Sequence, residues 1–284
     1  MEVTGSGEAL REVCEEARRK DLSVGFVATM GSLHEGHLSL ARRAREECDF
    51  TVLSIFVNPL QFGPAEDLAS YPRHLGRDSG LAEGAGVDVL FTPDDKEMYP
   101  EGPPIVTVDP GPLGDRLEGE SRPGHFRGVC TVVAKLFDLV GPCRAYFGEK
   151  DAQQLAVIRR MTVDLDMPVK VIGCPTVRDA DGLAMSSRNA YLSEEERRAA
   201  LVLSRALLES TELVAAGERD AGALRARMRA RIEAEPLATL DYVAVVDDRT
   251  FEDVDRIFGP SRGLVAARVG KARLIDNALL TRED

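Results

Sequence analysis

The stretch Thr29-Met-Gly-Ser-Leu-His-Glu-Gly-His37 follows the apolar run Ser23–Thr29 and leads into an amphipathic run, His37–Cys48. An apolar strand, a short loop and a helix in this order are typical of the first unit of a doubly wound α/β fold. In such a unit the helix N-terminus points free N–H groups and the positive end of its dipole at a bound anion. The stretch therefore predicts a Rossmann-like sheet with a phosphate-binding loop.

The sequence around this stretch repeats the pattern as far as about residue 177, with apolar runs rich in Val, Ile and Phe between amphipathic runs. Strands that alternate with helices predict a parallel sheet, because each helix supplies the crossover between parallel strands. The stretch 93–123 is rich in Pro, Gly and charge, and we expect a long loop there. The predicted strands are Ser23–Thr29, Phe50–Val57, Val87–Thr92, Ala145–Phe147 and Val169–Gly173, and the predicted helices are Glu8–Lys20, His37–Cys48, His125–Val140 and Ala152–Met161.

The chain changes character after Asn189. Ser193 and Glu196 have the spacing of a capping box, and a highly charged helical region follows to about Glu235. The runs Leu240–Val246 and Gly263–Val269 alternate in polarity, which is typical of a small antiparallel sheet. We therefore expect two domains, a Rossmann-like domain over residues 1–177 and a smaller α+β domain over residues 178–284.

Composition narrows the classes of partner. The chain has 284 residues, a net charge of −12 and five scattered cysteines without a CxxC pair. An acidic protein repels the phosphate backbone of nucleic acids, so we expect no DNA or tRNA partner. The cysteine spacing predicts neither a zinc cage nor a disulfide framework. No apolar run reaches the roughly 18 residues of a membrane span and no signal-peptide pattern is present, so we expect no membrane association and a cytoplasmic location.

The loop carries two histidines, His34 and His37, on either side of Gly36. Two imidazoles add hydrogen-bond donors beside the helix N-terminus, and a glycine lets a nucleotide approach the backbone closely. The chain has no GxxxxGK[ST] and no GxGxxG motif, so the P-loop and NAD interpretations lose support. An HxGH loop followed far downstream by Met185-Ser-Ser-Arg188 resembles the nucleotidyltransferase superfamily that includes class I aminoacyl-tRNA synthetases. The two serine hydroxyls and the arginine guanidinium of this downstream segment can hold the departing pyrophosphate.

Longer segments carry a closer resemblance. In chain order they are ATMGSLHEGHLSL, SIFVNPLQFGPAEDLASYPR, RLEGESRPGHFRGVCTVVAKLF, AYFGEKDAQQLAVIRRM and TVRDADGLAMSSRNAYLS, from Ala28 to Ser193, with IDN at Ile275–Asn277. They are similar to the successive signature blocks of the pantothenate synthetase, or pantoate–beta-alanine ligase, family. The resemblance implies that ATP and (R)-pantoate form pantoyl adenylate and pyrophosphate. The amine of beta-alanine then displaces AMP to give pantothenate. It also implies a homodimer and a C-terminal domain that acts as a lid.

The resemblance implies roles for individual residues as well. The expected catalytic residues are His37, His34, Lys150 and Arg188. The expected ATP-binding residues are Met30, Gly31, Ser32, Leu33, His34, Glu35, Gly36, His37, Gly148, Glu149, Lys150, Asp151, Val177, Met185, Ser186, Ser187 and Arg188. The residues expected to bind pantoate or beta-alanine are Gln61, Gln154, Asn58 and Arg122.

The residue types suit these roles. An amide such as Gln61 or Gln154 can donate to a substrate carboxylate without cancelling the charge that makes it a nucleophile. The ammonium of Lys150 could follow the α-phosphate as negative charge gathers there. The carboxylate of Asp151 could accept from ribose hydroxyls or cap the next helix.

Three further side chains have open roles. Arg122 and His125 add positive charge to the pocket or begin the helix that reaches Val140. Asp78 is a candidate ligand for Mg²⁺ through waters, because magnesium prefers a carboxylate together with phosphate oxygens. Mg²⁺ is expected with ATP whichever residue assists it.

Two other functions compete with an amide-forming ligase. One is a transferase that moves AMP or CMP onto a phosphorylated acceptor at the same HxGH site. It would leave the nucleotide joined to a stable product, whereas the ligase would release AMP only with both pantoate and beta-alanine present. The other is a silent nucleotide-binding module, which would have no use for the aligning side chains Gln61, Lys150 and Gln154.

Overall fold

The fold is taken from a computed structural model that describes residues 1–64, 66 and 68–281. The chain forms two compact units. The first comprises Met1–Glu149 and Gln153–Pro175, and the second comprises Lys150–Ala152 and the chain from Thr176 onward. The short segment Lys150–Ala152 thus belongs with residues that lie much later in the sequence.

The first unit is built on a six-stranded parallel sheet with the strand order β1-β4-β3-β2-β5-β6. The predicted doubly wound parallel sheet is confirmed. The N-terminal strand β1, which pairs with β4, was not predicted, because three residues are too few to show a period. The strands are β1 (Glu2–Thr4), β2 (Val24–Thr29), β3 (Phe50–Ile55), β4 (Val89–Phe91), β5 (Cys143–Gly148) and β6 (Val169–Cys174).

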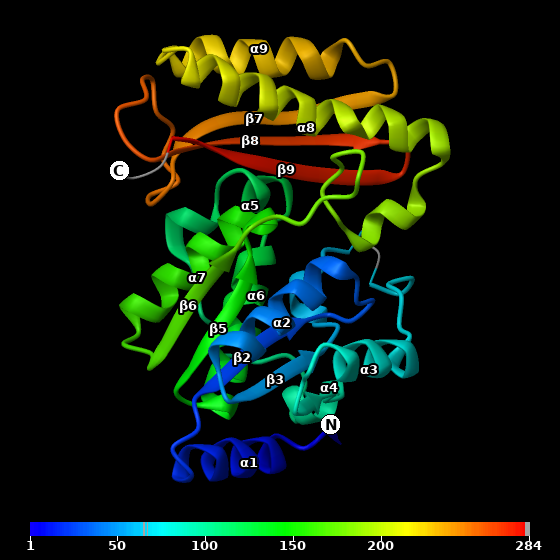
Figure 1. Cartoon of the computed structure of the whole chain (residues 1–284), viewed down its shortest axis with the longest axis vertical. Helices are drawn as coiled ribbons and strands as arrows, with labels where there is room; N and C mark the ends of the chain where they lie inside the picture. Colours follow the sequence, from blue (N-terminus) through cyan, green and yellow to red (C-terminus); the bar gives the residue numbers. More distant parts are fainter. Residues whose placement is uncertain (65, 67, 282–284) are drawn as a thin grey trace. The chain divides into compact units, whose positions relative to one another are not determined.

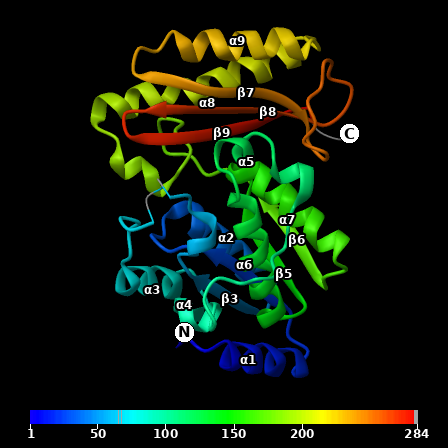
Figure 2. The same ribbon diagram turned by 180° about the vertical axis from the view of Figure 1, so that it is seen from behind.

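Helices cover both faces of this sheet (Figures 1 and 2). Phe26 and Val27 are neighbours on β2, yet they belong to different hydrophobic clusters, because successive strand residues point to opposite faces. Phe26 packs with residues of α1, α6 and α7, and Val27 packs with residues of α2 and α3. The helices are α1 (Gly7–Arg19), α2 (Glu35–Glu47), α3 (Leu75–Gly84), α6 (His125–Val140) and α7 (Ala152–Asp164).

The strand order reverses between β2 and β5. From β2 the chain proceeds to β3 and β4 on one side, whereas β5 and β6 continue on the other side. Ligands of open α/β sheets bind outside the carboxyl ends of the strands at such a switch point. The Met30–His37 loop follows the carboxyl end of β2, and Gly148 is the last residue of β5, so two of the predicted ATP segments begin at this point.

The stretch 93–123, predicted to be a long loop, contains only short helical turns: α4 (Asp95–Met98), the 3₁₀ helix η2 (Gly111–Gly114) and α5 (Glu118–Ser121). Helix α3, in contrast, was not predicted. Its sequence LGRDSGLAEG has three glycines and few apolar residues, which hides the helical period.

The second unit consists of a three-stranded antiparallel sheet, β7-β8-β9, with α8 and α9 over one face (Figures 1 and 2). The capping box at Ser193 and Glu196 is present at the start of α8. The predicted helical region is divided, because the chain turns near Gly217, whose φ of 106° favours glycine. Strand β9 was not predicted. The elements are α8 (Glu194–Ala215), α9 (Ala221–Glu233), β7 (Ala238–Asp247), β8 (Ser261–Val269) and β9 (Ala272–Thr281).

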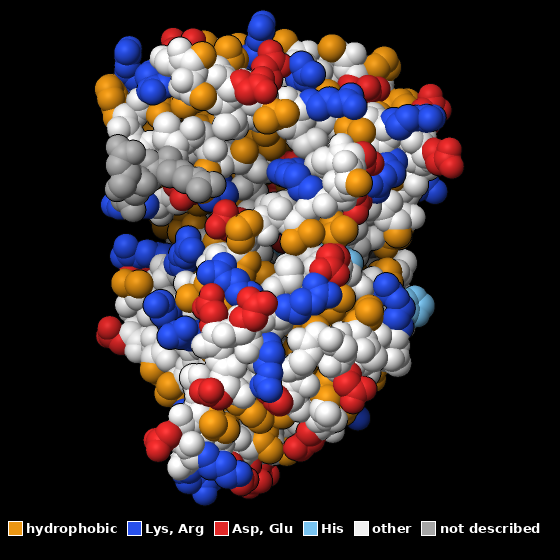
Figure 3. Space-filling view, viewed as in Figure 1, with side chains coloured by type: hydrophobic (Ala, Val, Ile, Leu, Met, Phe, Trp, Pro, Cys, Tyr) orange, Lys and Arg blue, Asp and Glu red, His pale blue; other side chains and the backbone are white. Residues whose placement is uncertain are grey.

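Basic and acidic side chains are intermixed on the surface drawn in Figure 3. Many of the arginines form ion pairs, such as Arg11 with Asp138 and Arg160 with Asp164. None of the helices in the described part of the chain is both long enough and apolar enough to span a bilayer.

Candidate active site

The Met30–His37 loop leaves β2 through two residues in the left-handed region, Gly31 (φ 80°) and Ser32 (φ 50°). A side chain at Gly31 would begin 3.0 Å from Ile55 Cγ2 and 3.2 Å from Asp78 Oδ2, so the conformation favours glycine and a side chain would crowd both neighbours. Thr29 Oγ1 accepts a 3.1 Å hydrogen bond from the Gly31 N–H and donates to the Ser54 carbonyl. These contacts turn the chain sharply at the end of β2.

Asp78 fixes the next part of the loop. Its carboxylate is buried and accepts hydrogen bonds from the backbone N–H groups of Ser32 (2.7 Å) and Leu33 (2.9 Å). Hydrogen bonds to a charged carboxylate are strong, so Asp78 holds Ser32 in its unfavourable backbone conformation.

The proposed Mg²⁺ role does not fit Asp78. Both carboxylate oxygens are used by the loop, and the side chain is about 1% exposed. Within residues 1–64, 66 and 68–281 no group of three or more His, Cys, Asp or Glu side chains is arranged to hold a metal ion. The expectation that Asp78 assists Mg²⁺ through waters required an accessible carboxylate, whereas this carboxylate is buried and used by the loop.

The two histidines lie together at the start of α2. His34 is the N-cap, and its Nδ1 accepts a 3.2 Å hydrogen bond from the Gly36 N–H. The rings of His34 and His37 are 4.1 Å apart between centroids and are tilted by 33°. Both side chains are half-buried, and Leu33 beside them is fully buried and anchors the loop in the core. The arrangement presents two imidazoles next to the positive end of the α2 dipole.

The remaining members of the loop differ in exposure. Met30, Ser32 and Gly36 are half-buried. Glu35 is exposed, and its carboxylate forms an ion pair with Arg42 of the same helix.

Asn58 and Gln61 form a buried amide pair after β3. Asn58 caps the 3₁₀ helix η1 (Pro59–Gln61), and its Nδ2 donates to Gln61 Oε1 (3.0 Å) and to the Gly128 carbonyl (3.2 Å). Tyr99 donates a 2.7 Å hydrogen bond to Asn58 Oδ1, and burial raises the pKa of Tyr99. Gln61 Nε2 lies 3.3 Å from Met30 Sδ, which joins the amide pair to the loop. Sequence reasoning missed Tyr99.

Arg122 and His125 contact the backbone of Gln61. His125 Nδ1 lies 2.9 Å from the Gln61 carbonyl, and Arg122 forms an ion pair with Glu66 (2.5 Å). Burial and the adjacent Arg122 guanidinium lower the pKa of His125 from 6.5 to about 4. His125 is therefore neutral near pH 7. The expectation that it adds positive charge to the pocket is wrong. His125 is the first residue of α6, as the sequence predicted, whereas Arg122 is the C-cap residue of α5.

Gln153 and Gln154 have different environments. Gln153 is buried, donates to the carbonyls of Leu113 and Arg116, and accepts from the Glu118 N–H. It therefore holds the 93–123 stretch in place, a role that the sequence did not reveal. Gln154, the predicted pantoate ligand, is half-buried on α7.

The GEKD segment spans the division between the units. Gly148 and Glu149 belong to the first unit, whereas Lys150 and Asp151 belong to the second. All four residues are half-buried. The side chain of Lys150 is 20% exposed, and its Nζ lies 3.6 Å from Asp151 Oδ1.

The Ser-Ser-Arg segment follows a hairpin-like loop in the second unit. The Met185 N–H donates to the Val177 carbonyl, and the Asp179 N–H donates to the Leu183 carbonyl. Ser186 Oγ accepts from the Arg188 N–H and caps the 3₁₀ helix η4 (Ser187–Tyr191). The predicted residues here are half-buried, namely Val177, Met185, Ser186, Ser187 and Arg188.

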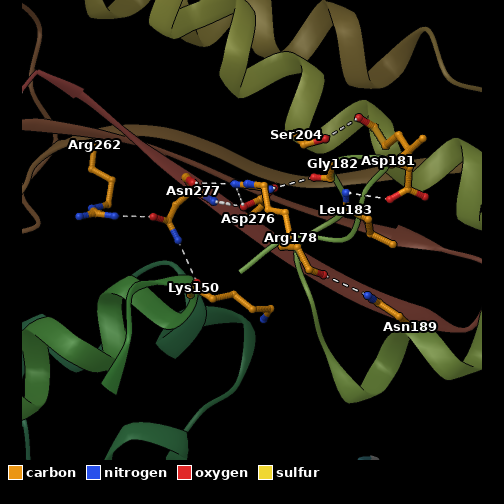
Figure 4. Close-up of polar contacts among 12 residues, drawn as sticks. Lys150, Arg178, Asp181, Gly182, Leu183, Asn189, Ser204, Arg262, Asp276 and Asn277 are labelled. Carbon is orange, nitrogen blue, oxygen red and sulfur yellow. Dashed lines mark hydrogen bonds and ion pairs between the residues drawn. The ribbon is translucent and has the colours of Figure 1, made fainter. Parts of the chain in front are cut away.

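The predicted residues thus form two sets. The first unit contains Met30 to His37, Asn58, Gln61, Arg122, Gly148, Glu149 and Gln154. The second unit contains Lys150, Asp151, Val177 and Met185 to Arg188. In the second unit Asp276 and Asn277 of β9 contact the residues around the predicted set, and the signal for them in the sequence is the IDN motif (Figure 4).

Comparisons with known proteins agree on one family. The family model described as pantoate-beta-alanine ligase matches residues 2–279. A pantothenate synthetase of Heliobacterium modesticaldum is 60% identical over 96% of this chain and 98% of its own length. One from Moorella thermoacetica is 53% identical over the whole of both chains.

Solved structures are similar as well. The crystal structure of a pantothenate synthetase from Thermus thermophilus has a TM-score of 0.92 and 50% identity, with 99% of each chain covered. A pantoate-beta-alanine ligase from Francisella tularensis, solved in complex with beta-gamma ATP and beta-alanine, has a TM-score of 0.80 and 34% identity. It covers 99% of this chain and 98% of its own.

Proposed function

The chain belongs to the pantoate–beta-alanine ligase family, and we propose that it joins (R)-pantoate to beta-alanine through a pantoyl adenylate. The ATP-dependent condensation is the reaction of this chain. The Francisella relative was solved with an ATP species and beta-alanine, which supports the same two ligands here. The observation that carries the proposal is the Met30–His37 loop, which two backbone hydrogen bonds to Asp78 hold at the switch point of the sheet.

In the first step a carboxylate oxygen of pantoate attacks the α-phosphorus of ATP. The bond from this phosphorus to the oxygen that bridges to the β-phosphate breaks, and pyrophosphate leaves with that electron pair. Negative charge increases on the phosphoryl oxygens as the reaction proceeds, so catalysis depends on fixed hydrogen-bond donors and positive charges.

Five side chains are proposed to supply these donors. His34 and His37 bind phosphate oxygens at the N-terminus of α2, where the helix dipole adds to their effect. Lys150 follows the α-phosphate, and the hydroxyl of Ser187 and the guanidinium of Arg188 hold the departing pyrophosphate. Ser186 Oγ accepts from the Arg188 backbone, so its contribution includes holding the turn.

Pantoate is proposed to bind at the buried amide pair. Gln61 Oε1 accepts from Asn58, and this fixes the amide so that Nε2 is directed toward Met30. An oriented amide aligns a carboxylate or hydroxyl without neutralising it. Gln154 is proposed as the second pantoate ligand. Arg122 is proposed to act at the same site while it holds Glu66, with which it forms an ion pair.

In the second step the free amine of beta-alanine attacks the acyl carbon of the adenylate. The carbon–oxygen bond to AMP breaks, AMP leaves with the electron pair, and the nitrogen gives up a proton to form the amide. Acyl adenylates hydrolyse readily, so water has to be excluded between the two steps. The division into residues 1–177 and 178–284, the lid role of the second part, the homodimer and the cytoplasmic location remain predictions. Light scattering at working concentration tests the homodimer.

Mg²⁺ is expected to arrive as the ATP complex, and no step is assigned to a protein-bound metal. It would neutralise charge on the phosphates when present. Because Asp78 does not fit a ligand role, we assign no Mg²⁺ ligand to this chain.

An AMP-release assay with each substrate omitted in turn tests the proposal. Steady release of AMP is expected only with ATP, pantoate and beta-alanine together. ATP–pyrophosphate exchange that requires pantoate but no beta-alanine is the expected sign of the adenylate. A stable product that keeps the nucleotide would instead indicate a nucleotidyltransferase, and exchange without pantoate would contradict the proposed first step.

A further inference from the structure

We propose that the dipeptide Asp276–Asn277 of β9 is a positioning element for ATP. Asn277 acts through the backbone of Lys150, and Asp276 acts through Arg178 and the segment that leads to Arg188. This inference rests on the proposed function, because it concerns two segments to which that proposal gives ATP contacts. All of these residues belong to the second unit.

Asn277 connects β8 to Lys150. Its Nδ2 donates a 2.9 Å hydrogen bond to the Lys150 carbonyl, and its Oδ1 accepts a 2.5 Å hydrogen bond from Arg262 (Figure 4). Arg262 is buried and also forms an ion pair with Asp248. The three side chains form a line that ends at the backbone from which the Lys150 side chain extends.

The chemistry at position 277 requires an amide. Asn277 is 4% exposed, so its polar atoms need partners inside the protein. The reverse orientation would place its NH₂ group against the Arg262 guanidinium and its oxygen against the Lys150 carbonyl, and both contacts would be repulsive. A carboxylate would keep the partner Arg262 but lose the donor to Lys150. Asn277 therefore transmits the fixed position of Arg262 to the backbone of Lys150.

Asp276 holds the second segment. Its carboxylate binds Arg178 through two hydrogen bonds of 2.7 and 2.9 Å, and Asp276 is 4% exposed. The Arg178 guanidinium also donates to the Gly182 carbonyl, so it closes the turn of the hairpin-like loop. Asn189 donates to the Ala184 carbonyl, which ties η4 to the same loop. The ion pair thus fixes the backbone that enters Met185 and Ser186.

Burying these polar groups is unfavourable unless each gains a partner. The hydrophobic cluster of the second unit consists of apolar residues from α8, α9 and the sheet together with Leu183 and Ile257, and neither Asp276 nor Asn277 is a member of it. Two adjacent residues of one strand hold both segments, so the distance between Lys150 and the Arg178 loop is set by rigid β structure. Such rigid support is what a site for a charged, flexible ligand needs.

The test is a double-mutant cycle measured by ATP–pyrophosphate exchange in the presence of pantoate. The variants are Asn277→Asp, Lys150→Ala and the combination. Asn277→Asp is expected to slow exchange about tenfold in the wild type and less than about twofold when Lys150 is already Ala. Equal effects of Asn277→Asp in both backgrounds, or wild-type exchange in Asn277→Asp, would overturn the proposal.

The proposed role of Asp276 is tested separately, through its partner Arg178. Arg178→Lys keeps the charge and loses the two-point contact, and the KM for ATP is expected to rise severalfold. An unchanged KM for ATP would overturn the proposed role of Asp276.

Controls separate positioning from folding. Arg273 lies on β9, like Asp276 and Asn277, and Arg273→Ala removes its ion pair with Asp241 of β7, so this variant is expected to leave exchange unchanged. Asn277→Ala serves as a second variant if Asn277→Asp does not fold, and thermal unfolding of each variant shows that the protein is intact. Wild-type exchange in Lys150→Ala would contradict the proposed role of Lys150. If Lys150→Ala slows exchange but Asn277→Asp has the same effect with and without Lys150→Ala, only the present inference would be contradicted.

Discussion

Asp78 Oδ2 lies 2.7 Å from the backbone nitrogen of Ser32, a residue 46 positions earlier in the chain. A buried carboxylate thereby holds the Met30–His37 loop, whose own sequence favours a different local conformation, since Ser32 has a φ of 50°. The negative charge of Asp78 is directed at the backbone N–H groups of Ser32 and Leu33, and these two hydrogen bonds hold the loop in its conformation. This relationship leads to the first prediction.

Asp78→Ala is expected to lower kcat/KM for ATP on the order of tenfold or more and to destabilise the protein by about 2–4 kcal/mol. It leaves two backbone donors without their acceptor, and each such loss costs about 1–3 kcal/mol. Steady-state kinetics and urea unfolding measure the two effects. Glu83→Ala, which removes an exposed carboxylate from the same helix, is the control and should change neither quantity. Wild-type kinetics in Asp78→Ala would contradict the loop-holding role.

His37→Ala and His34→Ala are each expected to lower the rate of pantothenate formation on the order of a hundredfold. The loss of one positioned donor to a developing negative charge has effects of this size. The measurement is initial rate at saturating substrates. The matched control is His74→Ala, because His74 is exposed and makes no side-chain cap contact at the start of α3. A loss in the His74 variant equal to that in the His37 variant would contradict a specific role.

Arg178→Ala is expected to destabilise the protein by about 3–5 kcal/mol, because it leaves the carboxylate of Asp276 buried without its partner. The comparison is Arg160→Ala, which breaks an ion pair whose side chains are 67% and 47% exposed and which should therefore change the stability little. Chemical unfolding of both variants gives the two values. Similar small losses in both would contradict the structural role given to the buried pair.

The stability of the protein is expected to fall as the pH decreases from about 6.5 to about 4. In this window the unfolded chain binds a proton at His125, whereas the folded protein does not, because burial and Arg122 hold the pKa of His125 at about 4. The unfolded state therefore binds more protons, and stability rises with pH by up to about 3 kcal/mol across the window.

His125→Asn removes this titration and should reduce the slope. Urea unfolding at several pH values between 4 and 7 measures the slopes. An identical slope in the wild type and His125→Asn would show that His125 titrates normally in the folded protein.

Several parts of the fold could be predicted from the sequence because their signals are local. The β2 strand, the loop and the start of α2 are encoded in consecutive residues from Ser23 to Cys48, and the structure has them in that order. The capping box at Ser193 is equally local and was confirmed. Helix α3 and strand β1 were missed, because three glycines hide the period of the first and the second is very short.

The candidate site, like the fold, could be predicted from the sequence only in part. The residue types of His34, His37 and Lys150 and their neighbours were sufficient to predict phosphate binding. The partners of these residues were not predictable. Sequence reasoning made Asp78 a candidate Mg²⁺ ligand, whereas the structure buries it against the loop, and nothing in the sequence distinguished the buried Gln153 from the half-buried Gln154.

The sequence by itself determined the doubly wound sheet, the family and the chemistry of the residues expected to meet ATP, since strand periods, caps and motifs are written in adjacent positions. Only the tertiary structure decided which side chains hold those residues in place. Asn277 reaches the Lys150 carbonyl across 127 positions, and Asp78 reaches Ser32 across 46. Hydrogen bonds of this kind exist only after the core has brought distant segments together, because their strength depends on distances and burial that no local pattern specifies.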